Sequence, residues 1–230
     1  MIKAVIFDLF GTLVDAPLKT DYWEFLRAVA EVLKVSPEKM TSVWNDSTER
    51  RNDGRDGNFA AYVHYLCEDL GVRHPSHVVG KTFSLRADLT SKWMIPRDDA
   101  TKTLEYLKER NLKIGLISDA SYDVPVLWED NPLKKYFSST IFSCSVQLKK
   151  PDPRIFQLAC DELDVKPSEC LYVGDGGSME LTGAEKVGMH PIRMSVAGEA
   201  DSDLHRIEVD NWQGKTISTL SDLIDIIKVR

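Results

Sequence analysis

The segment "VIFDLFGTLVD" (residues 5–15) joins a buried-strand pattern to one carboxylate. Its first residues form a continuous apolar run, which is typical of a strand buried on both faces of a parallel sheet. Asp8 interrupts the run, and Gly11 follows shortly after it. Because an unpaired buried charge costs much free energy, Asp8 is expected to have a partner or a chemical role.

Further apolar stretches of the same kind occur along the chain. Each is short, rich in Ile, Val, Leu or Phe, and ends in a small or polar residue. They predict strands over residues 3–10, 112–118, 139–145, 170–175 and 190–196. Helical periodicity over 97–111, 152–164 and 218–229 lies between or after them. This alternation predicts an α/β fold, a Rossmann-like doubly wound parallel sheet.

Residues 16–95 break the alternation, because only helical periodicity is found there. The amphipathic segments cover residues 20–35, 36–50, 58–72 and 76–93. We therefore expect two domains. Residues 1–15 and 96–230 would form the Rossmann-like core, and residues 16–95 would form an α-helical insert.

The composition is that of an ordinary globular protein. The 230 residues carry a formal net charge of −7, and 43% of them are hydrophobic. The negative charge argues against nucleic acid and anionic membranes as partners. None of the four cysteines has C-x-x-C spacing, so no zinc site or redox motif is indicated. We expect a cytoplasmic protein, either a monomer or a homodimer, without a signal peptide or membrane span.

Polar side chains gather where the predicted strands end, which is where ligands bind in open α/β sheets. Two carboxylates from different strands can hold one Mg²⁺ through their oxygen atoms. A lysine and hydroxyl groups can hold a phosphoryl group, whose transfer depends on positioning and charge neutralisation. The candidates at these strand ends are Asp8, Thr12, Ser118, Lys150, Asp175 and Glu180.

Four ordered segments resemble the motifs of the haloacid dehalogenase-like (HAD) hydrolase superfamily. They are "DLFGT" (8–12), "LISDAS" (116–121), "KKPDPRIF" (149–156) and "VGDGGSMELTGA" (173–184). Their order and spacing also match, and the resemblance covers essentially the whole chain. It implies that residues 16–95 are the helical cap that the family carries between its first and second motifs.

The resemblance also implies roles for the matching residues. Asp8 matches the family's nucleophile, which forms an aspartyl-phosphate intermediate in phosphatases. Lys150 matches a catalytic lysine that holds the phosphate together with hydroxyl groups. Thr12 and Ser118 match those hydroxyl groups, and we count Asp119 with them as a phosphate-binding candidate.

A Mg²⁺ site is implied in the same way. Asp8, Asp175 and the backbone carbonyl of Phe10 match the family's metal ligands. Glu180 stands where the family usually has Asp, and its longer side chain favours contact with the metal through water.

Phe10 departs from the pattern of the family's phosphatases. These enzymes usually carry a second Asp at this position, which protonates the leaving group and then activates water. General acid–base catalysis of this kind typically raises the reaction rate by a factor of about 10²–10⁴. Family members that cleave carbon–halogen bonds carry an aromatic residue there, so Phe10 favours a dehalogenase. The dehalogenases lack the metal-binding Asp of the fourth motif, which this chain has as Asp175. We give Asp175 more weight than Phe10, because a bound cation is usually the largest local charge in its site. This weighting favours phosphatase or phosphotransferase chemistry.

Three functions therefore stay open. The first is a Mg²⁺-dependent phosphatase or phosphotransferase acting on a small phosphorylated metabolite. The second is a metal-independent 2-haloacid dehalogenase, also using Asp8, and the third is a binder of phosphorylated metabolites without turnover. Arg50 and Arg51 in the insert are candidates for binding a second anionic group of the substrate.

Overall fold

Six parallel strands form a single sheet in a computed structural model of the protein, which describes residues 1–73, 76–199 and 210–228. Their order is β3-β2-β1-β4-β5-β6, so the predicted doubly wound sheet is confirmed. The strands are β1 (Ala4–Phe7), β2 (Lys113–Ser118), β3 (Ser139–Phe142), β4 (Cys170–Gly174), β5 (His190–Met194) and β6 (Thr216–Ile217).

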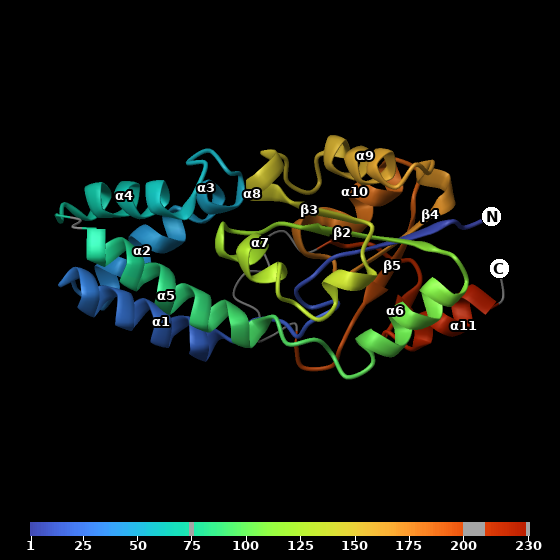
Figure 1. Cartoon of the computed structure of the whole chain (residues 1–230), viewed down its shortest axis with the longest axis horizontal. Coiled ribbons are helices and arrows are strands. Elements are labelled where there is room, and N and C mark those ends of the chain that lie inside the picture. The colour runs from blue at the N-terminus through green and yellow to red at the C-terminus, as the bar shows by residue number, and fades with distance from the viewer. Residues whose placement is uncertain (74–75, 200–209, 229–230) are drawn as a thin grey trace.

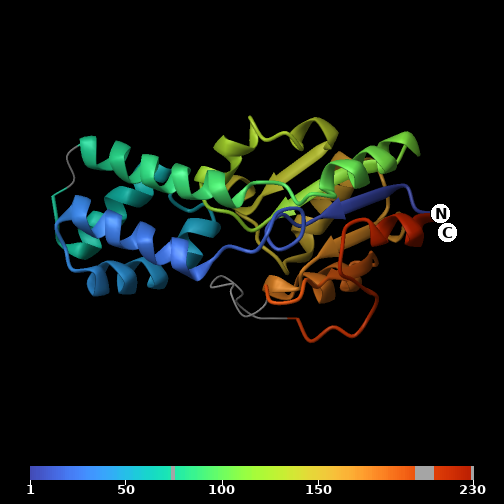
Figure 2. The same ribbon diagram turned by 90° about the horizontal axis from the view of Figure 1, so that it is seen from below.

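Helices cover both faces of the sheet (Figures 1 and 2). On one face α6 (Ala100–Glu109) packs against β2 and α11 (Asp222–Lys228) packs on α6. On the other face α9 (Pro153–Glu162) packs against β2 and β3, and α10 (Glu180–Lys186) packs against β4 and β5. The sequence between the strands builds α7 (Asp123–Trp128), α8 (Ser143–Val146) and three 3₁₀ turns, η1 (Lys134–Tyr136), η2 (Pro167–Glu169) and η3 (Gly177–Met179).

The strand β1 shows why the first segment reads as a continuous apolar run. Val5 and Phe7 belong to the apolar core that includes α6 and α11, whereas Ala4 and Ile6 belong to the core under α9 and α10. All four side chains are fully buried. Both faces of the strand are covered, so alternation between polar and apolar residues is absent.

Several predicted strands extend too far, and the difference is largest in two of them. The strand predicted over 139–145 ends at Phe142, and residues 143–146 form the short helix α8. The chain turns there because the Ser143 hydroxyl accepts a hydrogen bond from the backbone N–H of Ala120 at 2.9 Å. Similarly, β1 ends at Phe7, and the following backbone turns so that the N–H of Leu13 donates to the carbonyl of Leu9 at 2.9 Å.

The helices α1 to α5 form the insert at one end of the molecule, beyond the carboxyl ends of the strands (Figure 1). Trp44 lies at its centre, with its ring edge-on to Phe25 at 5.0 Å and to Tyr62 at 5.5 Å between ring centroids. The second helix begins as predicted, because the Ser36 hydroxyl accepts a hydrogen bond from the N–H of Lys39. The helices are α1 (Lys19–Leu33), α2 (Pro37–Asp46), α3 (Thr48–Asn52), α4 (Phe59–Leu70) and α5 (Ser76–Trp93).

The strand order reverses between β1 and β4, since β2 lies on one side of β1 and β4 on the other. This reversal is the position at which ligands bind in doubly wound sheets. The backbone N–H of Asp8 donates to the carbonyl of Val173 at 2.8 Å. The first residue after β1 is thereby fixed beside the carboxyl end of β4.

None of the helices described here is both long enough and apolar enough to cross a membrane.

Phe156 gives a test of the second apolar core. Its fully buried ring lies edge-on to Tyr172 at 5.4 Å and joins α9 to β4. We expect Phe156→Ala to lower the free energy of unfolding by about 3–5 kcal/mol, because the cavity left behind adds to the lost burial. Urea unfolding measures this. The exposed neighbour Gln157, changed to Ala, should alter stability by less than about 0.5 kcal/mol, and equal effects of the two changes would contradict the packing described.

Candidate active site

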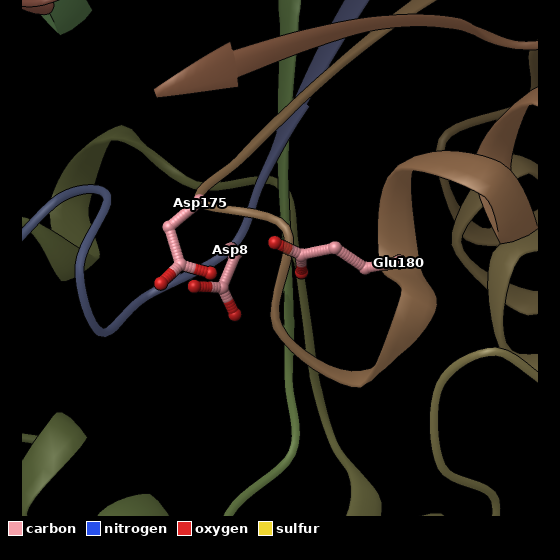
Figure 3. A group of neighbouring side chains, drawn as sticks. All are labelled: Asp8, Asp175 and Glu180. Atoms are coloured by element: carbon pink, nitrogen blue, oxygen red, sulfur yellow. The ribbon is translucent and has the colours of Figure 1, made fainter. Parts of the chain in front are cut away.

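Three buried carboxylates meet at the carboxyl end of the sheet (Figure 3). Asp8 follows β1, Asp175 follows β4, and Glu180 begins α10. One oxygen from each carboxylate lies within 4.8 Å of the others. The sequence prediction that these residues come together is therefore matched by their geometry.

Lys150 reaches into this cluster and contacts two of its members. Its Nζ lies 2.6 Å from Oδ1 of Asp8 and 2.6 Å from Oε2 of Glu180. Only 4% of the lysine side chain is exposed. The cluster therefore combines three carboxylates with one ammonium group, and such buried charges depend on one another for compensation.

Glu180 has both oxygens engaged by the protein. Oε1 accepts the backbone N–H of Gly176 at 2.9 Å, and Oε2 accepts the hydroxyl of Tyr172 at 2.8 Å as well as the lysine. A Cβ at Gly174 would lie 2.2 Å from Oε1, so only glycine leaves room for this carboxylate. Glu180 is thus placed to orient Lys150. Both of its oxygens already accept hydrogen bonds from the protein, which agrees with contact to a metal through water rather than directly.

The charges shift the pKa values of these groups. Burial raises the pKa of Asp8 well above its usual range, although the Lys150 ammonium opposes this rise. Burial alone would lower the pKa of Lys150, but the carboxylates of Asp8 and Glu180 raise it well above its usual value. The lysine is therefore cationic at every physiological pH, and the Asp8 carboxylate lies in a place that disfavours its negative charge.

The hydroxyl groups expected to hold a phosphoryl group lie beside the nucleophile candidate. The Thr12 hydroxyl donates to Oδ2 of Asp8 at 3.3 Å. Ser118 ends β2, and its hydroxyl is buried without a hydrogen-bond partner among the residues that the structure describes. A buried unsatisfied hydroxyl is uncommon and indicates a missing partner.

Asp119 lies next to Ser118 and lines the same cavity, and its carboxylate also contacts the backbone of Lys150. Its Oδ1 accepts the backbone N–H of Lys150 at 3.0 Å. Burial raises the pKa of Asp119, while Lys150 opposes that rise. A carboxylate only accepts hydrogen bonds when ionised, so Asp119 is suited to fixing the backbone of Lys150 rather than to contacting a phosphate.

Gly11 lets two loops approach closely. Its φ of +74° lies in the left-handed region, and a Cβ there would lie 2.8 Å from Oδ2 of Asp175. The loop after β1 can therefore pass directly over Asp175, and the preceding residue, Phe10, lies at the wall of the cavity with its ring half-buried.

A cavity of about 500 Å³ lies over the carboxylates, between the core and the insert. Of the insert arginines predicted to bind an anion, Arg51 lines this cavity. Arg50 is not among the lining residues, because it binds Asp56 and stacks on the ring of Tyr65 at 3.8 Å. Sequence reasoning missed a second arginine, Arg86, which lines the cavity from α5. Arg86 belongs to no motif, so periodicity alone gave no signal for it.

Tyr172 was also missed. It lies inside an apolar strand, and its ring packs in the core while its hydroxyl binds Glu180. The available signal was weak: a buried tyrosine hydroxyl needs a partner, but the sequence does not say which one.

Known proteins resemble this chain in both sequence and structure. The family model described as haloacid dehalogenase-like hydrolase matches residues 2–188. The chain is a member of the haloacid dehalogenase-like hydrolase family. The predicted resemblance is thereby confirmed, and the protein is a HAD-like hydrolase.

Two different activities occur among the relatives of this chain. The glyceraldehyde 3-phosphate phosphatase of Pyrococcus furiosus is 26% identical over 99% of this chain and 93% of its own. The (S)-2-haloacid dehalogenase 4A of Burkholderia cepacia is 26% identical over 86% of this chain and 84% of its own. The structure of a 2-haloacid dehalogenase from Pseudomonas syringae matches with a TM-score of 0.73 at 22% identity, covering 100% of this chain and 99% of that one. Similarity alone therefore leaves phosphatase and dehalogenase open.

Asp8→Asn should stabilise the protein in the absence of divalent cations. Because burial raises its pKa, folded Asp8 holds a proton at pH values where the unfolded residue has lost it, so stability falls as pH rises through this range. Asparagine has no charge to bury. We expect a higher thermal unfolding midpoint for the variant at pH 7.5 in EDTA, with the gain shrinking toward pH 4.

Asp69 on α4 is exposed and serves as the matched control. Asp69→Asn should leave the midpoint at pH 7.5 unchanged. A midpoint for Asp8→Asn below that of the unaltered protein would contradict the account of the charges.

Proposed function

We propose that the protein is a Mg²⁺-dependent phosphatase or phosphotransferase that acts on small phosphorylated metabolites through Asp8. The observation that carries this proposal is the meeting of Asp8, Asp175 and Glu180 around Lys150. Three carboxylates and one ammonium leave an excess of negative charge in a buried place. A carbon–halogen bond gives no reason for that excess, whereas a divalent cation together with a phosphate does.

The residues fit Mg²⁺. Oxygen donors are what this ion prefers, and it usually binds one or two carboxylates. Asp8, Asp175 and the backbone carbonyl of Phe10 would hold it, while Glu180 would stay bound to Lys150 and Tyr172. When bound, the ion would offset negative charge on the phosphoryl oxygens.

The chain's own residues account for the transfer. An Asp8 oxygen would attack phosphorus, forming one P–O bond as the bond from phosphorus to the ester oxygen breaks. Lys150 and the unpartnered hydroxyl of Ser118 would hold the phosphoryl oxygens. Water would then attack the aspartyl-phosphate, releasing inorganic phosphate and restoring the Asp8 carboxylate, with the water proton passing to solvent.

Phe10 limits this chemistry. The phenyl ring holds no transferable proton, so the leaving oxygen would take its proton from water. We therefore expect good leaving groups, such as aryl or acyl phosphates, to react faster than alkyl phosphates.

Two alternatives keep some support. An aromatic residue at position 10 and the dehalogenase relatives favour a metal-independent 2-haloacid dehalogenase. The missing acid also favours a protein that binds phosphorylated metabolites without turning them over. Metal dependence separates the first alternative from the phosphatase, and turnover separates the second.

An assay with p-nitrophenyl phosphate tests the proposal. We expect release of p-nitrophenol in Mg²⁺, none in EDTA, and none from Asp8→Asn in Mg²⁺, because that variant lacks the attacking oxygen. Chloride release from 2-chloropropionate that persists in EDTA would instead establish the dehalogenase. If no turnover is found but calorimetry shows that phosphate esters bind, the protein is a binder of phosphorylated metabolites without turnover.

Phe10→Asp should restore the missing acid. The position lies at the wall of the cavity, so a carboxyl group there could protonate the leaving oxygen. We expect kcat for an alkyl phosphate such as ethyl phosphate to rise by a factor of about 10²–10⁴, and kcat for p-nitrophenyl phosphate to change less. Phe10→Leu controls for loss of the ring, and an equal effect of both substitutions would refute the role assigned to position 10.

A further inference from the structure

Two buried arginines of the insert line the cavity. Arg51 comes from α3 and Arg86 from α5, and both line the cavity that Asp8 also lines. Their exposed fractions are 4% and 8%. Arginine is rarely buried to this degree unless it is paired, so each guanidinium needs a physical explanation.

Arg51 lacks a counter-ion among the residues described. Its guanidinium donates to the hydroxyls of Ser47 at 3.1 Å, Tyr62 at 3.0 Å and Thr48 at 2.9 Å, and to the carbonyl of Trp44. All of these acceptors are neutral. The group also lies over the Trp44 ring at 4.3 Å. These contacts hold the guanidinium in place, but none of them cancels its charge.

Arg86 has a counter-ion but an unused donor. Its Nε donates to Oδ2 of Asp123 at 3.0 Å, and its Nη2 donates to the Ser121 hydroxyl at 3.3 Å. Its Nη1 is buried and has no hydrogen-bond partner in the described part of the chain. A buried donor without an acceptor costs free energy that a ligand oxygen would recover.

The buried groups at this end of the cavity carry a net positive charge. Asp123 is fully buried and cancels one of the two guanidinium charges, so one positive charge remains. Two acids of the insert also line the cavity, Asp46 and Glu49, but both are exposed to solvent, and Glu49 is paired with Lys149 at 2.6 Å. The cavity is therefore negative at the sheet and positive at the buried surface of the insert.

We propose that Arg51 and Arg86 bind a second oxyanion of the substrate, remote from the bond that is broken. The group is a carboxylate or a second phosphate. Arg51 supplies the uncompensated charge and Arg86 supplies the free N–H of Nη1. This inference rests on the proposed phosphatase function, and it narrows the substrate class to phosphomonoesters of small acids or to bisphosphates.

Substrate pairs that differ in one group test this inference. 3-Phosphoglycerate and glyceraldehyde 3-phosphate share a carbon skeleton, but the first carries a carboxylate where the second carries an aldehyde. Fructose 1,6-bisphosphate and fructose 6-phosphate differ in a second phosphate. We expect kcat/KM to favour the more anionic member of at least one pair by about 10- to 100-fold, the range for hydrogen bonds to charged groups. The pair that shows the preference identifies the kind of oxyanion.

Conservative variants separate recognition from folding. Arg86→Lys keeps a positive charge beside Asp123 but replaces the planar guanidinium, with its several N–H donors, by a single ammonium group. Arg51→Lys makes the same change at the other arginine. We expect each to abolish most of the preference ratio by raising KM for the more anionic substrate. Arg50→Lys, which alters an arginine that does not line the cavity, should leave the ratio unchanged. Thermal unfolding midpoints show that each variant is folded.

Binding measured without turnover keeps the inference distinct from the proposed function. Calorimetric titration of the unaltered and Arg86→Lys proteins in EDTA should show the same preference and its loss. Preferential binding without hydrolysis of any ester would overturn the phosphatase and support the oxyanion site. Hydrolysis without preference in either pair, or a preference that survives in both lysine variants, would overturn the oxyanion site alone.

Discussion

The two contacts of Lys150 organise the chemistry of the whole site. Its Nζ is shared between Asp8 and Glu180, which lie far apart in the sequence and belong to different elements. Each carboxylate alone would be a costly buried charge, and the lysine alone would be one too. Because the one ammonium group contacts both carboxylates, the loops after β1 and β4 and the loop before α9 are held in one arrangement.

The meeting of the site's carboxylates could be predicted from the sequence. Asp8 and Asp175 directly follow apolar strands, and strand ends meet at one edge of a parallel sheet, so their proximity followed from the pattern together with the topology rule. The boundaries were less predictable. The segment "STIFSCS" (139–145) was predicted to be a single strand, yet its last residues form α8 because the Ser143 hydroxyl bonds to the loop after β2. A contact with a residue 23 positions away leaves no local trace in the sequence.

The insert was predictable as a set of helices but not as a binding surface. Helical periodicity predicted its segments. Which arginine side chains line the cavity, however, depends on how the helices pack. Arg50 and Arg51 are neighbours in the sequence, yet one pairs with Asp56 and the other lines the cavity. Arg86 shows the same limit, because its contact with Asp123 joins the insert to a helix of the core. Such pairings are set by tertiary structure, which single-sequence patterns do not encode.

Gly174 and Glu180 carry a consequence for sequence variation among related proteins. A Cβ on residue 174 would occupy the place of the Glu180 carboxylate, so the longer acid and the absence of a side chain are a matched pair. An aspartate at position 180 would be one methylene shorter and would withdraw from that space. The two positions should therefore vary together across relatives, with larger residues at 174 accompanied by the shorter acid at 180.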